Sequence, residues 1–142
     1  MLAWVGKAKY THGALVVVEN HDGELLLVRQ RFRERNCWGC PGGFLKVGEP
    51  PEEAAAREYS EETGLSSAGL RLQGVSSYKQ PWAWHWEHLF YLRLDGRSDP
   101  MPDSTEIKAA GWFTRDEVEE LRLTAATTEA LRRLEEHGVG LT

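Results

Sequence analysis

Three carboxylates at helical spacing are the residues of this chain with the clearest capacity for chemistry. Glu58, Glu61 and Glu62 occupy positions i, i+3 and i+4, which fall on one face of an α-helix. Three like charges there repel one another, so they need solvent, a basic neighbour or a divalent metal ion. Arg57 can relieve part of this repulsion, because it lies one turn before Glu61 and one turn after Glu53. A solvated acidic helix and a metal site are both open from these residues alone.

The residues around the carboxylates predict a helix with a defined start and end. Pro50 and Pro51 are tolerated only at a helix start, and residues 54–56 are alanines, which are strong helix formers. Gly64 supplies the left-handed residue that ends the helix. Upstream, residues 41–43 (Pro-Gly-Gly) predict a loop whose backbone can approach a ligand or a metal closely.

A longer pattern runs through this helix and the loop before it. It reads G-x5-E-x7-R-E-U-x-E-E-x-G-U, where U is a bulky apolar residue, and its fixed positions are Gly43, Glu49, Arg57, Glu58, Tyr59, Glu61, Glu62, Gly64 and Leu65. The pattern closely resembles the signature box of the Nudix hydrolases. Weaker likenesses, in residues 38–43 and in residues 106–113, extend the resemblance over most of residues 12–121.

The resemblance implies an α/β fold, a Nudix-type α/β/α sandwich with a mixed β-sheet, and cleavage of a nucleoside diphosphate linked to a second moiety. It also implies roles for individual residues. The metal ligands would be Glu58, Glu61 and Glu62, joined by the backbone carbonyl of Gly43. Arg57 would orient one of the glutamates, and Glu49 would anchor the loop to the helix. Glu106 would reach the metals or act as the base.

Oxygen-only ligands select a hard cation, so Mg²⁺ is expected and Mn²⁺ is an acceptable substitute. Such ions neutralise phosphate oxygens, align the substrate and lower the pKa of a bound water. The sequence shows no nucleophilic Ser or Cys triad, so direct attack by water is the most economical mechanism.

Basic residues outside the box are candidate phosphate contacts. Arg29, Arg31, Arg33 and Arg35 alternate along the chain, which places four guanidinium groups on one side of an extended segment. They form either a solvated edge or a basic rail that binds a polyphosphate. Lys46 stands where many family members carry an acidic residue, and this departure would alter metal affinity or recruit a phosphate. Arg29, Arg31 and Lys46 are therefore expected to bind substrate.

Tryptophans open a strand in which apolar residues recur with period two. Trp82, Trp84 and Trp86 begin this series, which runs to Leu94, while the alternate positions are more polar. Trp82 and Trp84 are expected either to stack on a base of the substrate or to bury against a second subunit in a homodimer.

Length and composition describe one ordinary soluble domain over residues 1–142. A net charge of −5 argues against general nucleic-acid binding. The apolar runs are too short to span a bilayer and the N-terminus lacks a signal-peptide pattern, so a cytoplasmic location is expected. Cys37 and Cys40 form a C-x-x-C, but neither a redox pair nor a zinc site finds its other requirements in this sequence, and chance spacing of reduced cysteines is favoured.

Strands are expected at residues 14–19, 24–30, 70–78, 82–94 and 111–113, with further helices at 114–121 and 125–137.

The first functional hypothesis is a Mg²⁺-dependent pyrophosphohydrolase acting on a nucleoside diphosphate derivative such as ADP-ribose, a nucleotide sugar or a dinucleotide. Its alternatives are a nucleoside triphosphate pyrophosphatase that clears damaged nucleotides and a Nudix-fold module that binds a nucleotide without cleaving it. A redox or zinc module built on the two cysteines is a more distant alternative.

Overall fold

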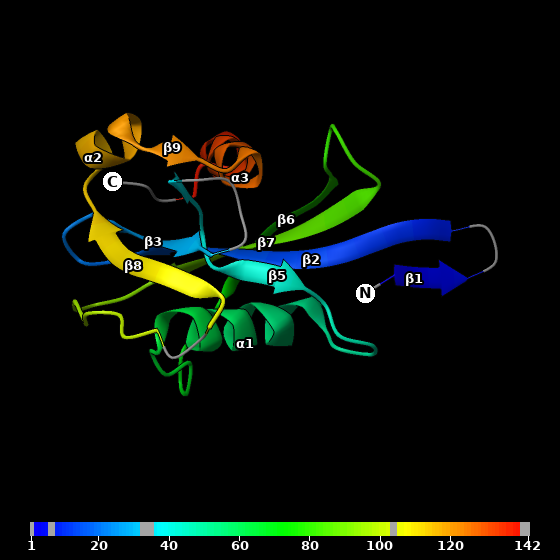
Figure 1. Cartoon of the computed structure of the whole chain (residues 1–142), viewed down its shortest axis with the longest axis horizontal. Helices are drawn as coiled ribbons and strands as arrows, with labels where there is room; N and C mark the ends of the chain where they lie inside the picture. The colour runs from blue at the N-terminus through cyan, green and yellow to red at the C-terminus, as the bar shows by residue number, and fades with distance from the viewer. Residues whose placement is uncertain (1, 6–7, 32–35, 103–104, 140–142) are drawn as a thin grey trace.

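A mixed β-sheet with helices on both faces forms the frame of the protein (Figure 1). The computed structural model describes residues 2–5, 8–31, 36–102 and 105–139. Its elements in chain order are β1 (Leu2–Val5), β2 (Ala8–Glu19), β3 (Leu25–Gln30), β4 (Cys37–Trp38), β5 (Gly42–Phe44), α1 (Pro51–Thr63), β6 (Gln73–Lys79), β7 (His85–Arg93), β8 (Ile107–Phe113), α2 (Arg115–Glu120), β9 (Arg122–Leu123) and α3 (Ala125–Glu136).

The long strand β2 is the centre of the sheet. The strand order is β6-β7-β2-β3-β8, and β1 and β5 also pair with β2. Strands β2 and β7 are parallel, whereas β2 pairs antiparallel with β1, β3 and β5, which makes the sheet mixed. A separate parallel pair joins β4 to β9 and brings the start of α3 over the sheet.

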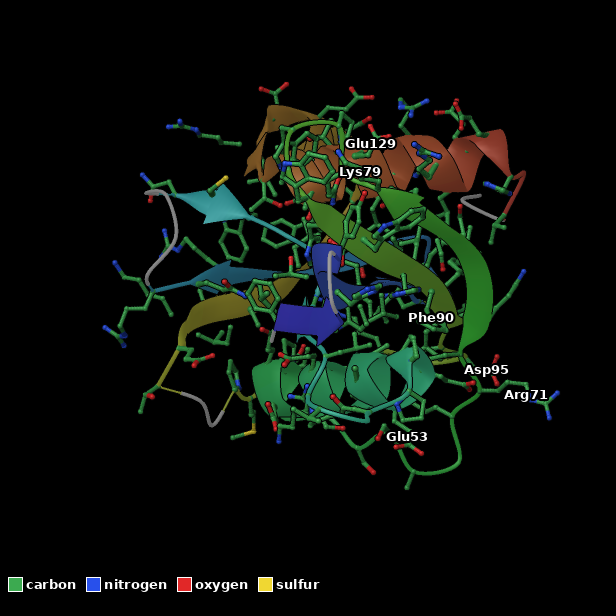
Figure 2. The ribbon with its side chains drawn as sticks, turned by 90° about the vertical axis from the view of Figure 1, so that its right-hand side faces the viewer. Glu53, Arg71, Lys79, Phe90, Asp95 and Glu129 are labelled. Atoms are coloured by element: carbon green, nitrogen blue, oxygen red, sulfur yellow. The ribbon has the colours of Figure 1, made fainter. Side chains whose placement is uncertain are left out.

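Two hydrophobic clusters show that the sheet is covered on both faces. On one face Val16 and Leu92 pack with Ala55 and Tyr59 of α1. On the other face the core includes Ala130 and Leu134 of α3, together with buried strand residues. Figure 2 shows the same layers edge-on, with Glu53 on the α1 side and Glu129 on the α3 side. The expected α/β/α sandwich with a mixed sheet is confirmed.

The predicted secondary structure needs several corrections. The strand expected from Trp82 begins at His85, and the two first tryptophans of that series lie in the turn between β6 and β7. Its supposedly polar face is also wrong, because Leu89 and Tyr91 on that face are buried in the core beneath α3. The loop expected at the Pro-Gly-Gly segment contains β5, and the last strand starts at Ile107 rather than at Gly111.

The helix ends agree with their sequence signals. Helix α1 starts at Pro51 and is closed by Gly64, whose φ of 74° is left-handed and whose N–H donates to the Ser60 carbonyl. The capping box predicted before α2 forms between Thr114 and Glu117. Within the described residues, no helix is long and apolar enough to cross a membrane.

The end of α1 supplies a test of the fold. A Cβ added to Gly64 would lie 2.0 Å from the Met101 carbonyl oxygen, whereas Gly69 has a similar φ of 76° and open space around the same position. We expect Gly69→Ala to lose about 1–2 kcal/mol of unfolding free energy, the cost of a left-handed alanine. Gly64→Ala should lose roughly 1–3 kcal/mol more, because the segment at Met101 must move.

Urea denaturation of both variants and the parent protein measures this difference. Equal losses in the two variants would contradict a fixed contact between the end of α1 and the segment at Met101.

Candidate active site

The guanidinium group of Arg57 holds the acidic cluster of α1 together. Its Nε and Nη2 donate to the two carboxylate oxygens of Glu49 at 2.8 and 3.0 Å, a bidentate pair. Its Nη1 donates to Glu58 at 2.7 Å and to Glu61 at 3.3 Å, and Nη2 also donates to the Phe44 carbonyl at 3.2 Å. One cation therefore joins three carboxylates to the end of β5.

Glu49 serves as the anchor between the loop and the helix, as predicted. Hydrogen bonding from Arg57 is the main reason that the pKa of Glu49 falls to about 2. The same carboxylate accepts a hydrogen bond from the backbone N–H of Lys46 at 3.0 Å, which closes the loop before α1. Glu49 is thus an anion at any physiological pH, and the loop is tied to the same guanidinium as the cluster.

Glu62 is the buried member of the cluster, with only 3% of its surface exposed. Its Oε1 accepts the Gly42 N–H at 2.9 Å and its Oε2 accepts Nε2 of Gln30 at 3.1 Å. Burial, and then the charge of Glu58, raise the pKa of Glu62 to about 8 despite these donors. Ionisation of Glu62 is therefore unfavourable in this site, and a bound cation would favour it.

The Glu58 carboxylate occupies the space that a side chain at Gly43 would need. A Cβ on Gly43 would lie 2.7 Å from the Glu58 carboxyl carbon, so a larger residue there would displace the Glu58 carboxylate. Burial raises the pKa of Glu58 in spite of its hydrogen bond with Arg57, and the charge of Glu61 adds to the rise. Glu58 and Glu62 are therefore crowded, partly buried acids that lie against the backbone of β5.

The chemistry of these donors fits a hard divalent cation. Burial and a neighbouring carboxylate, Glu61 for Glu58 and Glu58 for Glu62, disfavour the ionised forms, which a positive charge between them would stabilise. Glu61 is exposed and turned toward Arg57. In the part of the chain that the structure describes, no three acidic, histidine or cysteine side chains are already grouped so as to hold a metal ion. Glu61 would therefore have to turn away from Arg57 to join Glu58 and Glu62.

A cavity lies directly beside the cluster, on the α3 face of the sheet. Its cavity volume is about 80 Å³, and the hollow around it holds about 570 Å³ when the open solvent at its mouth is included. Its lining comes from five regions of the chain, namely β2 (Ala14, Leu15), β3 (Val28, Gln30), the β4–β5 region (Cys37, Gly39, Cys40, Gly42, Gly43, Phe44), β7 (His85, Glu87) and the start of α3 (Thr124, Ala126, Thr127). Gly42 and Gly43 belong to both the cavity and the acidic cluster, so a ligand in the cavity reaches the carboxylates.

The predicted phosphate contacts lie on several different elements. Arg29 donates to the Asn36 side chain at 2.8 Å and lies over the Trp38 ring, with 5.4 Å between its Cζ and the ring centroid. Arg31 donates from Nε to the Thr105 carbonyl at 3.0 Å. Lys46 is exposed in the loop before α1. Arg33 and Arg35 lie outside the described residues. The phosphate-binding role of this set stays a prediction.

Trp82 and Trp84 are solvent-exposed turn residues, 55% and 67% accessible. The Trp84 ring packs edge-on against Tyr10, with centroids 5.4 Å apart, and the Lys79 ammonium lies over it. Among the described residues, the cavity is lined by the neighbouring His85 but by neither tryptophan. Stacking on substrate and burial in a dimer both stay open for these two side chains.

Glu106 lies immediately before β8, and its backbone carbonyl accepts the Arg31 N–H at 2.7 Å. Its proposed action on the metals or as a base is not tested by these contacts.

Cys37 and Cys40 are both buried free thiols that line the cavity. Burial raises the pKa of Cys40 to about 12, so this thiol is protonated at physiological pH and is a poor nucleophile or metal ligand.

The sequence analysis missed the residues that orient Glu62. Gln30 stands between Arg29 and Arg31 and has no predicted role, although it is the donor that holds the second oxygen of Glu62. Gly42 is predicted in a loop that approaches a ligand or a metal, whereas the pairing of β5 with β2 fixes its backbone and its N–H donates to Glu62. No local signal in the sequence links Gln30 to Glu62, because the two residues lie 32 positions apart and meet through the packing of α1 on the sheet.

Comparisons with known proteins agree on one family. A family model described as NUDIX domain matches residues 9–134. A protein of Bacillus subtilis (strain 168), provisionally named an 8-oxo-dGTP diphosphatase, is 39% identical over 105 residues, which cover 74% of this chain and 67% of that protein. The NAD-capped RNA hydrolase NudC of Vibrio vulnificus (strain CMCP6) is 29% identical over 118 residues, and the match covers 82% of this chain but only 44% of NudC.

Solved structures give the same result. The MutT NUDIX hydrolase from Burkholderia pseudomallei superposes with a TM-score of 0.73 at 27% identity, over 89% of this chain and 98% of that one. The NUDIX domain of Shewanella oneidensis NrtR, in complex with ADP ribose, superposes with a TM-score of 0.79 over 96% of this chain and 95% of its own. At 16% identity this second likeness supports the fold alone.

The raised pKa of Glu62 predicts how metal and pH act on stability. In the unfolded chain this carboxyl ionises near its ordinary pKa of 4.5, whereas in the fold it keeps its proton up to about pH 8. Without metal, stability is therefore lost as the pH rises above 4.5. We expect Glu62→Gln to have a higher melting temperature than the parent protein at pH 8 in EDTA, and an equal one near pH 4.

Excess Mg²⁺ should reverse the order at pH 8, because binding to the folded parent protein stabilises it. Glu53→Gln is the matched control, since Glu53 is exposed on the outer side of the same helix and should give no Mg²⁺-dependent difference (Figure 2). A Glu62→Gln protein that melts below the parent protein in EDTA at pH 8 would refute the idea that ionisation of Glu62 destabilises the metal-free fold.

Proposed function

Because this chain belongs to the NUDIX family of hydrolases of phosphorus-containing anhydrides, we propose that it cleaves the diphosphate bridge of a nucleoside diphosphate linked to another moiety, with Mg²⁺ as its cofactor and Mn²⁺ as a substitute. The observation that carries the proposal is the pair of crowded carboxylates, Glu58 and Glu62, against the glycine strand that also walls the cavity. A diphosphate whose organic part lies in the cavity would meet them.

The residues of the cluster have separate tasks in this proposal. Glu58, Glu61 and Glu62, with the Gly43 carbonyl, would hold the cation, which supplies charge neutralisation of the diphosphate and a water of lowered pKa. Arg57 orients Glu58, while Gly42 and Gln30 orient Glu62. Arg29, Arg31 and Lys46 are proposed to contact phosphates, Trp82 and Trp84 to contact the organic groups, and Glu106 to act as base or ligand.

A second candidate function is hydrolysis of a nucleoside triphosphate. The 39% identity with the Bacillus subtilis protein provisionally named an 8-oxo-dGTP diphosphatase favours it. Both candidates need the same cluster, and they differ only in what is attached beyond the bridge. A module that binds a nucleotide without cleaving it has no need of crowded carboxylates whose pKa values are raised by burial, and the intact cluster argues against that alternative.

A substrate screen tests the proposal. The purified protein would be incubated with Mg²⁺ and with nucleotide sugars, dinucleotides, ADP-ribose and nucleoside triphosphates, and the products identified by chromatography and mass spectrometry. We expect turnover that is lost in EDTA and restored by Mg²⁺ or Mn²⁺. No turnover with any diphosphate-bridged compound would leave the non-catalytic module as the better description.

Loss of single carboxylates gives a sharper prediction. Glu61→Gln and Glu62→Gln keep the shape of the side chain and remove charge that the metal needs, so each should lower kcat by about 100-fold or more. Circular dichroism should show an unchanged fold. Glu53→Gln, on the same helix but exposed in its first turn, should keep the parental kcat. Parental activity of Glu61→Gln or Glu62→Gln with saturating Mg²⁺ would remove that residue from the catalytic assignment.

The bond that is broken can be read from isotope labelling. Water attacking one phosphorus of a diphosphate bridge places ¹⁸O from labelled solvent in only one of the two products. We therefore expect two phosphorylated products from a nucleotide sugar or a dinucleotide, with the label in one of them by mass spectrometry. Release of inorganic phosphate alone would identify a phosphatase instead.

A further inference from the structure

The cavity contains a carboxylate that the proposed chemistry does not use. Glu87 lies in β7, lines the cavity and is 5% exposed. Its Oε1 accepts Nε2 of Gln80 at 3.2 Å, and its Oε2 lies 3.4 Å from Nε2 of His85. Neither neighbour is a permanent cation. A buried carboxylate of this kind is costly unless further donors reach it, which makes its role in the cavity a question of ligand chemistry.

The backbone opposite Glu87 leaves room for its carboxylate. Gly13 in β2 pairs with Glu87 across the parallel strands. A Cβ on Gly13 would lie 2.8 Å from Oε2 of Glu87 and 2.8 Å from Nε2 of His85, so any larger residue would displace both groups. The absence of a side chain at Gly13 therefore allows the carboxylate and the imidazole to lie over the sheet at the cavity wall.

An acceptor without a donor lies beside Glu87. Among the described residues, Oε1 of Gln80 is buried without a hydrogen-bond partner, and the residue as a whole is 2% exposed. The charge of Glu87 adds to the effect of burial in raising the pKa values of Cys40 and Tyr78. This end of the cavity is therefore negative and rich in acceptors, and it matches a ligand that presents N–H donors.

The remaining walls suit a flat ring. Phe44 and His85 both line the cavity, with ring centroids 5.6 Å apart and planes at 88°, and Phe44 is 54% exposed. Leu15 and Val28 supply apolar surface on the sheet side. A planar heterocycle between these walls would cover Phe44, and the glycines of β5 would lead its phosphates toward Glu58 and Glu62.

We propose that this cavity binds a guanine-type base and that Glu87 selects it. Guanine presents a ring N–H and an amino group side by side, two donors that one carboxylate accepts together, whereas adenine presents an amino donor beside an acceptor nitrogen. A carboxylate accepts and cannot donate, so it favours the first edge and is repelled by the lone pair of the second. The inference rests on the proposed function only in taking the ligand to be a nucleotide.

Binding without turnover tests the selection. Calorimetric titrations of the parent protein in EDTA would use GMP, IMP and AMP. GMP carries two adjacent donors, IMP carries the ring N–H alone, and AMP carries an amino group beside an acceptor nitrogen. We expect GMP to bind roughly ten- to hundredfold more tightly than AMP, the range of discrimination given by a good bidentate base contact, with IMP between them. Equal affinities for GMP and AMP would overturn the proposal.

A matched pair of variants assigns the selection to Glu87. Glu87→Gln keeps the shape but replaces one acceptor oxygen by a donor, so the GMP-to-AMP ratio of affinities should fall to near one, with a GMP affinity below the parental value. Glu120→Gln, exposed on α2, should keep the parental ratio. Equal weakening of GMP and AMP by Glu87→Gln would mean that Glu87 only shapes the cavity, and would also overturn the proposal. Should Glu87→Gln fail to fold, the comparison of GMP, IMP and AMP with the parent protein still decides.

The two proposals fail in different ways. A protein that hydrolyses diphosphate bridges with no preference for the base contradicts the role of Glu87 and leaves the proposed function intact. Preferential GMP binding without any hydrolysis contradicts the proposed function and leaves the base selection intact.

Discussion

The site depends on the hydrogen bonds that Arg57 makes in several directions at once. A single guanidinium group neutralises Glu49, reaches Glu58 and Glu61, and binds the Phe44 carbonyl at the end of β5. Without it, like charges one turn apart on α1 would favour a separated arrangement. A lysine could not substitute, because its ammonium lacks the planar fork of donors that spans these acceptors. Arg57 thus fixes both the spacing of the carboxylates and the distance between α1 and the sheet.

The short strand β5 carries this arrangement to both faces of the sheet. Its pairing with β2 leaves a Cβ on Gly42 only 2.4 Å from the Ala14 carbonyl oxygen, and a Cβ on Gly43 would strike Glu58. Packing against the backbone therefore requires glycine at Gly42, whereas a side chain at Gly43 would force the Glu58 carboxylate out of its position. Because the two glycines have no side chains, the N–H of Gly42 reaches Glu62 on one face while the cavity opens on the other.

Local signals in the sequence were enough to predict α1, its end at Gly64, the capping box at Thr114 and the identity of the acidic cluster. Each depends on residues within a few positions of one another. The sequence did not show that Gln30 donates to Glu62 or that Glu87 lines a cavity with α3, because these contacts join residues 32 or more positions apart through sheet pairing and helix packing. The sequence predicts a strand at Trp82 and Trp84, where the structure has a turn, because period-two apolar residues continue past the point where the pairing of β6 with β7 stops.

Two kinds of buried or partly buried carboxyl group lie on either side of β5, and they demand different partners. Burial raises the pKa of both Glu58 and Glu62, and the charge of Glu58 adds to the rise at Glu62, so the pair calls for a concentrated positive charge, and bare phosphates would be repelled from it. Glu87 lies beside the Gln80 amide and the His85 imidazole, and the Gln80 amide oxygen has no partner among the described residues, so directed N–H donors would satisfy this end of the cavity. A nucleotide accompanied by a divalent cation meets both demands in only one orientation, with its base toward Glu87 and its diphosphate toward α1. The same electrostatics that make the empty site unfavourable would therefore also set the direction in which a substrate enters.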